Sequence, residues 1–255
     1  MTGIFAVEHE STAGGDRVVL VHGSLDRSSA FLRVQRLLDD LTVVRYDRRG
    51  YAKSIDMGAS STFEEQVDDL AEVVGGRPSV VAGHSLGGVI ALAFAQRAPE
   101  VVRAVVSYES PRPWLPEWPS GTAGSAATAS ATEAGVTAER FMRRMIGDDR
   151  WESLPERTKE QRRQEGPALV AELGSIRSPA PAPYDPALIT MPVVIGHGTR
   201  SRPHHQEGSG RLAQALPQGE LVVIQDADHG VHLSDPAAFA SLIRRALHLA
   251  DEGRS

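Results

Sequence analysis

The sequence of 255 residues contains no cysteine. This absence excludes disulfides, thiolate metal sites and a cysteine nucleophile. Long apolar runs are missing too, and none approaches the roughly 20 residues of a membrane-spanning helix. Residues 1–15 carry acidic groups and a histidine where a secretory signal would have a basic flank and an apolar block. We therefore expect a cytoplasmic protein, either an enzyme or a binding protein, without a membrane partner.

The chain also has no excess of basic over acidic residues. Acidic residues number 33 against 27 Lys and Arg, which gives a net charge of −6 at pH 7. The densest basic stretch, Arg157–Arg163, is interleaved with Glu156, Glu160 and Glu165. Such a mixture is typical of a solvated helix face, so we expect no nucleic-acid partner. Hydrophobic residues at 41% are ordinary for one globular domain, or for one domain with a modest insertion.

Apolar, β-branched runs alternate with helical patterns along most of the chain. The expected strands are Val18–His22, Thr42–Tyr46, Ser79–Gly83, Val101–Tyr108, Val193–His197 and Glu220–Ile224. The expected helices are Arg27–Leu41, a helix capped by Thr62 and Glu65, Leu86–Arg97, Glu207–Ala215 and one opening at Asp235-Pro236. This alternation predicts an α/β fold with a mainly parallel, doubly wound sheet covered on both faces. Ile4–His9 is a candidate antiparallel edge strand.

Residues 111–186 interrupt the alternation. Prolines are concentrated at both ends of this segment, at 111–119 and at 179–186, and helical stripes at Ala138–Ile146 and Leu169–Ile176 lie between them. Ser120–Gly135 consists almost entirely of Ala, Ser, Thr and Gly, and we expect it to be mobile. We interpret 111–186 as a helical cap or lid with Pro-rich connectors, inserted into a core of residues 1–110 and 187–255.

The pentapeptide Gly83-His84-Ser85-Leu86-Gly87 fits the pattern G-x-S-x-G, directly between an expected strand and an expected helix. A nucleophile elbow requires that context, because the turn strains the serine and the glycines remove the clash. A serine hydroxyl is a weak nucleophile at neutral pH and needs a base, which in turn needs an orienting group. The sequence predicts Ser85 as nucleophile; the alternative is a tight turn with an idle serine.

His229 is the candidate base. It lies between the last expected strand and the last helix, at the carboxyl edge of the sheet where ligands bind in such folds. His232, three residues on, is its nearest rival and a candidate pocket-lining residue. We interpret His22 and His84 as structural, and His197, His204 and His205 as solvated loop residues in preference to a metal pair.

In this order the motifs resemble the α/β-hydrolase superfamily, and the resemblance covers nearly the whole chain. The matching segments are His22-Gly23-Ser24, Tyr46–Ser54, the elbow, and Asp228-His229-Gly230 ahead of Leu233–Pro236. The resemblance implies that Ser85 is the nucleophile and His229 the general base. It also implies an oxyanion hole formed by the backbone N–H groups of Ser24 and Leu86, and a structural turn at Asp47–Ser54.

The acid of the triad departs from the commonest family pattern. That pattern places an Asp after the strand Val193–His197, but residues 198–206 contain no acid and the first to follow is Glu207. Some relatives carry the acid one strand earlier, where this chain has Glu109. An idle carboxylate is expensive at the end of an apolar strand, so we favour Glu109 over Glu207. The alternative is that Glu109 faces solvent at the junction with the cap.

Large apolar residues of the insertion are candidates for a substrate pocket. We expect Trp114, Met142 and Met145 to line it together with His232, with Trp118 and Trp151 as further candidates. For each of them the alternative is packing of the cap onto the core. The expected partner is a small-molecule substrate with an apolar acyl or ring part.

The expected function is that of a serine hydrolase, which cleaves an ester, thioester, lactone or small amide through an acyl-enzyme. One alternative uses the same triad for C–C bond hydrolysis, perhydrolysis, acyl transfer or cyclisation. A second alternative is a catalytically silent ligand-binding member of the family. Because no metal, flavin or nucleotide motif appears in the sequence, we expect no cofactor.

Overall fold

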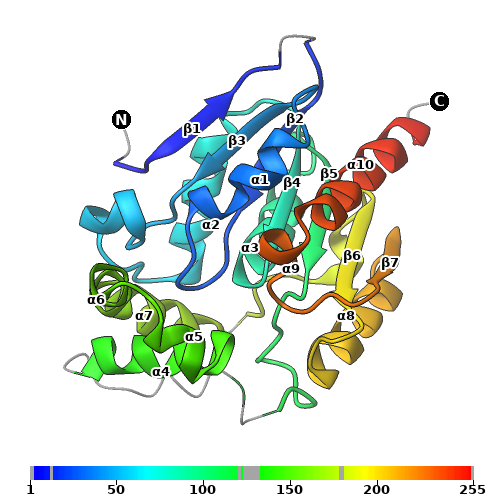
Figure 1. Ribbon diagram of the computed structural model, residues 1–255. Coiled ribbons are helices and arrows are strands. Elements are labelled where there is room, and N and C mark those ends of the chain that lie inside the picture. The colour runs from blue at the N-terminus through cyan, green and yellow to red at the C-terminus, as the bar shows by residue number, and fades with distance from the viewer. Residues whose placement is uncertain (1–2, 12–13, 120–121, 123–132, 178–180, 254–255) are drawn as a thin grey trace.

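The computed structural model describes residues 3–11, 14–119, 122, 133–177 and 181–253. Within these residues seven strands form one sheet in the order β1-β3-β2-β4-β5-β6-β7 (Figure 1). The strands are β1 (Ala6–His9), β2 (Arg17–Val21), β3 (Thr42–Tyr46), β4 (Ser79–His84), β5 (Val102–Tyr108), β6 (Val193–Gly198) and β7 (Gly219–Ile224). Only β1 runs antiparallel to its neighbour, while β2 to β7 are parallel. The predicted fold class and the antiparallel edge strand are therefore confirmed.

Ten α-helices belong to the described residues. They are α1 (Leu32–Arg36), α2 (Phe63–Val74), α3 (Leu86–Arg97), α4 (Ala134–Ile146), α5 (Asp148–Glu152), α6 (Glu156–Gln164), α7 (Gly166–Arg177), α8 (Pro203–Ala215), α9 (Val231–Ser234) and α10 (Pro236–Glu252). The helix caps follow local chemistry. The Thr62 hydroxyl accepts a hydrogen bond from the Glu65 amide at the start of α2, and Asp235 does the same for Ala238 at the start of α10.

Both faces of the sheet are buried, which explains why the strands are almost continuously apolar. On one face Val19 and Val21 of β2 pack in a core with α2, α3 and α8. On the other face Val18 and Leu20 pack with α1 and α10. Full burial of each such side chain stabilises the fold by about 1.5–3 kcal/mol. The sheet is thereby a rigid platform whose strands β2 and β4–β7 end at the same edge.

Two helices differ from the sequence-based expectation. The segment expected as one helix over Arg27–Leu41 is a short 3-10 helix, Ser28–Phe31, followed by α1, which ends at Arg36. Conversely, α8 begins at Pro203 and not at Glu207. Proline is favoured at the first helical position, where its missing N–H is not needed. The earlier start places two histidines, predicted to lie in a loop, in the first turn of a helix.

Helices α4–α7 occupy the predicted insertion between β5 and β6, at the lower left of Figure 1. Apolar residues join them to the core in one cluster, which consists of Leu25, Tyr51, Ala138, Phe141, Ala168, Leu169 and Leu173. Most of Ser120–Gly135, expected to be mobile, lies outside the described residues, and the division into core and cap stays a prediction. No helix of the described segments is long and apolar enough to cross a membrane.

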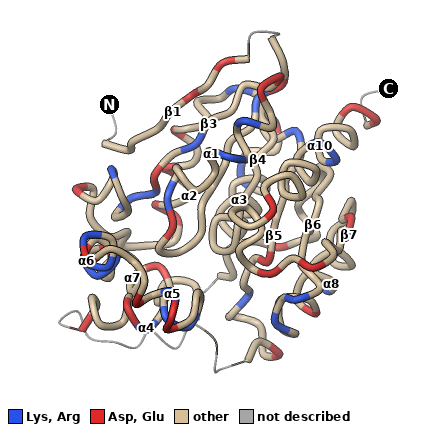
Figure 2. Tube along the Cα trace, viewed as in Figure 1, with Lys and Arg blue, Asp and Glu red and all other residues tan. Residues whose placement is uncertain are grey.

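The basic run of the insertion lies in and around α6, where charges of both signs occur together (Figure 2). Arg163 bonds to Glu139 at 2.9 Å and to Glu156 at 2.8 Å, and Arg162 bonds to Glu165 at 2.9 Å. These ion pairs offset the positive charge locally. The run thus has the mixed charge that the sequence indicates, but it is only partly solvated, because Lys159 and Glu165 are buried.

Candidate active site

Ser85 lies on a sharp turn between β4 and α3. Its backbone has φ 54° and ψ −125°, a conformation that costs free energy for any residue with a side chain. The positions beside the turn have no room for a side chain, because a Cβ at Gly83 would lie 2.3 Å from the carbonyl oxygen of Gly87. The turn is held by a 2.8 Å hydrogen bond from the Ser85 amide to the carbonyl of Tyr108. Local sequence and geometry both correspond to a nucleophile elbow.

His229 and Glu109 meet at the carboxyl edge of the sheet. Glu109 directly follows β5, and His229 lies in the loop between β7 and α9. His229 Nδ1 is 2.7 Å from Glu109 Oε2, so a neutral imidazole donates from Nδ1 and keeps its lone pair on Nε2. The same loop is tied to the elbow, because His84 Nε2 donates to the carbonyl oxygen of His229 at 2.7 Å. The residue before Ser85 thus holds the loop that carries the candidate base.

The Glu109 carboxylate is fully buried and well supplied with donors. Its relative exposure is 0%, and its second oxygen accepts hydrogen bonds from the Ser201 hydroxyl and, at 3.3 Å, from the Gly198 amide. Burial favours the neutral acid. However, the hydrogen bond and charge of His229, the charge of His205 and the Ser201 hydroxyl outweigh it and lower the pKa of Glu109 to about 2. The group is therefore an anion at neutral pH.

The alternative acids lie elsewhere. Glu207 is exposed on α8 and pairs with Arg211 at 3.6 Å, and Asp226 is exposed and pairs with Arg200 at 3.0 Å. The carboxylate within hydrogen-bond distance of His229 is that of Glu109, as expected from its place at the strand end.

The interpretation of His205 as a solvated loop residue is wrong. Its ring stacks on that of His229, with centroids 4.8 Å apart and planes at 25°. Its Nδ1 lies 4.0 Å from Glu109 Oε2, and burial holds the pKa of His205 well below its usual value. Sequence reasoning missed this contact because α8 was expected to begin four residues later. Pro203 was the signal that could have placed it.

The loop after β2 approaches the elbow closely at Gly23. A Cβ added to Gly23 would lie 3.0 Å from the Cβ of Ser85. Arg48 fixes this loop by donating hydrogen bonds to the carbonyl oxygens of His22 and Gly23, both at 2.9 Å. Ser24 follows in the same loop, so its backbone is held beside the nucleophile elbow.

Leu86 is the first residue of α3, where helix N–H groups have no partner inside the helix. The start of α3 packs tightly on β2, since a Cβ at Gly87 would lie 2.1 Å from the carbonyl oxygen of Val21. The sheet edge therefore brings a helix N-terminus and the Ser24 loop together around Ser85. Such an arrangement of backbone donors suits a developing oxyanion.

His232 was expected to line a substrate pocket, but the residue is only 2% exposed. The turn of α9 directs it inward against Phe31, with ring centroids 5.1 Å apart. Its Nε2 is 2.9 Å from Asp26 Oδ2. Burial would raise the pKa of Asp26, but the hydrogen bond and charge of His232 outweigh burial and lower it. His232 thus belongs to the buried layer beneath the elbow and does not line an open pocket.

The cap residues predicted to line the pocket have different surroundings. Trp114 packs edge-on against Tyr184, with centroids 5.7 Å apart, beside the main core. Met142 packs on the apolar cluster that includes Leu25, the residue after Ser24. Met145 is 36% exposed, so part of it is open to solvent. Of the three, Met142 is the one that packs on a cluster containing a residue of the loop after β2.

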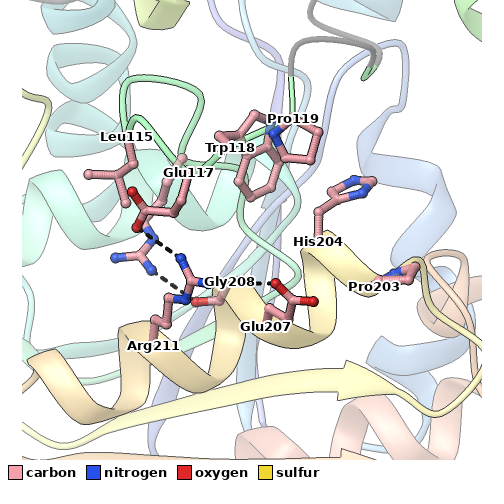
Figure 3. A pocket seen from close by; sticks show the side chains of 10 residues that line it. Leu115, Glu117, Trp118, Pro119, Pro203, His204, Glu207, Gly208 and Arg211 are labelled. Atoms are coloured by element: carbon pink, nitrogen blue, oxygen red, sulfur yellow. Dashed lines mark hydrogen bonds and ion pairs between the residues drawn. The ribbon is translucent and has the colours of Figure 1, made fainter.

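A cavity of about 260 Å³ lies between α8 and the segment after β5 (Figure 3). Its lining residues are Arg112, Leu115, Glu117, Trp118, Pro119, Pro203, His204, Glu207, Gly208 and Arg211. Figure 3 shows Arg211 between Glu117 and Glu207, at 3.3 and 3.6 Å. Ser85 and His229 do not line this cavity. One of its lining residues, His204, directly precedes His205, whose ring stacks on that of His229.

The chain is similar to known proteins along most of its length. Residues 18–242 match the sequence model of the alpha/beta hydrolase family. Over 247 residues the chain is 25% identical to a pimeloyl-(acyl-carrier protein) methyl ester esterase from Nitrosomonas europaea, covering 92% of this chain and 97% of the relative. It is 30% identical over 191 residues to the protein of the same name from Aromatoleum aromaticum, with 65% and 72% covered.

The fold is also that of solved esterases. A thermophilic esterase from Thermogutta terrifontis superposes with a TM-score of 0.73 at 23% identity, over 97% of this chain and 93% of that one. The fold, the elbow at Ser85 and the sequence match over most of the chain lead to the same conclusion. The chain is an enzyme that belongs to the alpha/beta hydrolase family.

Proposed function

We propose that the protein is a serine esterase that acts through Ser85, His229 and Glu109. The observation that carries this proposal is the 2.7 Å hydrogen bond between His229 Nδ1 and the buried carboxylate of Glu109, at the same sheet edge as the strained elbow. A carboxylate bonded to Nδ1 keeps the lone pair of the imidazole on Nε2. That tautomer is the one that can accept a proton from a serine hydroxyl.

In the proposed reaction, Ser85 Oγ attacks the carbonyl carbon of an ester while His229 Nε2 takes the hydroxyl proton. The backbone N–H groups of Ser24 and Leu86 hold the negative oxygen of the tetrahedral intermediate. The intermediate collapses, the C–O bond to the alcohol breaks, and His229 returns the proton to the departing alkoxide. Water then attacks the acyl-enzyme while His229 takes a proton from it. The C–O bond to Ser85 breaks, His229 returns the proton to Ser85 Oγ, and the carboxylic acid is released.

A carboxylic ester or lactone is the substrate class that we propose. The relatives from Nitrosomonas europaea and Aromatoleum aromaticum are methyl ester esterases by name, which supports ester cleavage over amide cleavage. Leu25, which follows Ser24, belongs to an apolar cluster on which Met142 packs, and we propose that this cluster contacts an apolar acyl group. Burial of an apolar acyl chain there would contribute about 0.8 kcal/mol per methylene group.

The test is a panel of p-nitrophenyl esters of graded acyl length, assayed with the wild-type protein and with Ser85→Ala. We expect turnover with a preferred chain length, and its loss in the variant without loss of fold, because the turn accepts a smaller side chain. Circular dichroism and thermal unfolding monitor the fold. Near-wild-type turnover in Ser85→Ala contradicts the serine mechanism, and wild-type protein without turnover on any ester contradicts the substrate class.

A further inference from the structure

The ring of a fourth residue, His205, packs on the proposed triad. His205 lies in the first turn of α8. Its ring is nearly parallel to that of His229, with centroids 4.8 Å apart and planes at 25°. His229 itself lies in the loop between β7 and α9, where no helix or strand fixes its side chain. The orientation of its ring therefore depends on tertiary contacts.

The hydrogen bond to Glu109 fixes one atom of His229 but not the plane of its ring. Nδ1 is held 2.7 Å from Glu109 Oε2, and such a bond permits the ring to turn about the bond axis, which swings the lone pair of Nε2. In the proposed reaction that lone pair takes the proton of Ser85, so its direction matters as much as the tautomer. A ring packed nearly parallel on His229 opposes the turn, because the two rings would collide. The ring of His84, 4.7 Å away, is tilted by 53° and restricts the plane less.

His205 makes this contact without competing for the carboxylate. Its Nδ1 lies 4.0 Å from Glu109 Oε2, too far for a hydrogen bond, and has no hydrogen-bond partner among the described residues. Burial, together with the charge that His229 carries when protonated, holds the pKa of His205 well below its usual value. His205 is therefore uncharged at neutral pH and does not repel the imidazolium that forms on His229 in the proposed reaction.

The segment that holds Glu109 also places His205. The hydroxyl of Ser201 donates to the Glu109 carboxylate, and the side-chain amide of Gln206 donates to the carbonyl oxygen of Ser201 at 2.7 Å. The first turn of α8 is thereby tied to the residue that supports the acid. One short segment fixes both the carboxylate that accepts from the candidate base and the ring that packs on that base.

Other rings keep His205 in place. The centroid of its ring lies 4.3 Å from that of His204 and 5.8 Å from that of Trp118, and its side chain is only 12% exposed. Close packing of this kind leaves few rotamers open. His205 can therefore transmit the fixed position of α8 to the ring of His229, which lies on a loop.

We propose that His205 is a positioning residue, whose stacked ring holds the imidazole of His229 in the plane that directs Nε2 towards Ser85. The inference rests on the proposed esterase function, but it gives His205 no chemistry of its own. His205 takes no proton and acts only through His229. A flat ring at this position is what the role requires, because the contact with His229 is made by the face of the ring and not by its nitrogen atoms.

Three substitutions separate the ring from its nitrogen atoms. His205→Ala removes the ring, and kcat on a p-nitrophenyl ester should fall about 10–100-fold. KM should stay within about two-fold, since the lost contact acts on the transition state and not on substrate binding. His205→Gln keeps a polar side chain without a ring and should lose as much kcat as the alanine variant. His205→Phe restores a flat ring and should keep kcat within about three-fold of wild type.

Proton NMR of the free protein observes the His229 ring directly and needs no substrate. The proton between His229 Nδ1 and Glu109 gives a low-field signal when it exchanges slowly with water, and its absence in Glu109→Gln assigns it. Wild type and His205→Phe should show this signal near neutral pH, whereas His205→Ala and His205→Gln should broaden or lose it. A protein that cleaves no ester but shows this pattern contradicts the esterase proposal and supports the positioning role.

His248→Ala is the matched control. His248 is an exposed histidine on α10, with Nε2 3.3 Å from Glu252 Oε1, and its loss should change neither kcat nor the low-field signal. Circular dichroism and Tm verify the folding of each variant. If His205→Ala does not fold, His205→Gln decides the question in its place.

Three results would overturn the proposal. The first is wild-type kcat together with an unchanged NMR signal in His205→Ala. The second is loss of kcat in His205→Phe with full kcat in His205→Gln, which would assign the role to hydrogen bonding and not to the ring. The third is a raised KM with unchanged kcat in His205→Ala, which would make His205 a substrate contact.

Discussion

For single residues, Glu109 shows which features of a site residue can be predicted from the sequence and which cannot. Its place after an apolar strand indicates a buried carboxylate. Because residues 198–206 contain no acid that could pair with His229, the sequence also indicates His229 as the partner of Glu109. The sequence did not indicate the supporting donors. Ser201 lies 92 positions along the chain from Glu109, and its approach depends on how β6 ends and α8 begins. Contacts of this kind arise from tertiary packing, which no local pattern encodes.

The substitution Glu109→Gln tests the role of the carboxylate. A glutamine keeps the shape but can donate to His229 Nδ1, which stabilises the wrong imidazole tautomer. We expect kcat to fall by up to about 10⁴-fold, as in other triads, with the fold retained. Steady-state kinetics on a p-nitrophenyl ester measure this loss. Glu207→Gln, an exposed glutamate on α8, is the control and should keep wild-type kcat; equal losses in the two variants would refute the assignment.

The lowered pKa of Glu109 also predicts a pH dependence of stability. The folded state binds the proton of this group less tightly than the unfolded state, so its ionised form stabilises the fold above pH 4.5. This contribution, roughly 3 kcal/mol, is lost as the pH falls from 4.5 towards about 2. The stability difference between wild type and Glu109→Gln should therefore be constant above pH 5 and shrink below it. Urea unfolding at a series of pH values measures it, and a difference that does not vary with pH contradicts the lowered pKa as the source of this stability.

At the scale of elements, strands and helices were predicted correctly where local sequence patterns determine their position. They were misplaced where tertiary contacts determine where an element begins or ends. The elbow between β4 and α3 and the caps of α2 and α10 follow from residues next to one another. The start of α8 was missed, and with it the stack of His205 on His229. The elements of the insertion are connected to the core through a buried ion pair that the sequence did not indicate.

That ion pair joins Arg48, in the turn after β3, to Glu172 on α7. The charged atoms are 2.8 Å apart and both side chains are 1% exposed. Arg48 also holds the carbonyl oxygens of His22 and Gly23, so one guanidinium connects α7 to the loop beside Ser85. The insertion and the candidate active site are thereby coupled.

Glu172→Gln should destabilise the protein by about 3–5 kcal/mol, because it leaves the buried charge of Arg48 uncompensated. We expect kcat/KM to fall as well, since the loop at Gly23 loses part of its anchor. Thermal or urea unfolding and ester kinetics measure the two effects. The control is Glu160→Gln on α6, an exposed glutamate 3.6 Å from Arg163, for which less than about 1 kcal/mol is expected. A similarly small effect in Glu172→Gln would show that the pair does not anchor the insertion.

At the scale of the whole molecule, the fold class was predictable because alternating strands and helices in one chain leave few arrangements. That regularity also explains why the candidate site could be predicted in outline. Parallel strands end at one edge, so the loops that follow β2, β4, β5 and β7 converge there although they are far apart in sequence. Which side chains touch within the edge, such as His232 with Asp26, depended on packing and was not predictable.

The proposed function requires that Ser85 is an activated nucleophile. The most direct measurement is labelling by a fluorophosphonate, which reacts with activated serines, followed by mass spectrometry of the digested protein. We expect one adduct per chain on the peptide that contains Ser85, at a rate that falls strongly in His229→Ala and in Glu109→Gln. An unlabelled wild-type protein, an adduct on another serine, or unchanged labelling in His229→Ala would contradict the account.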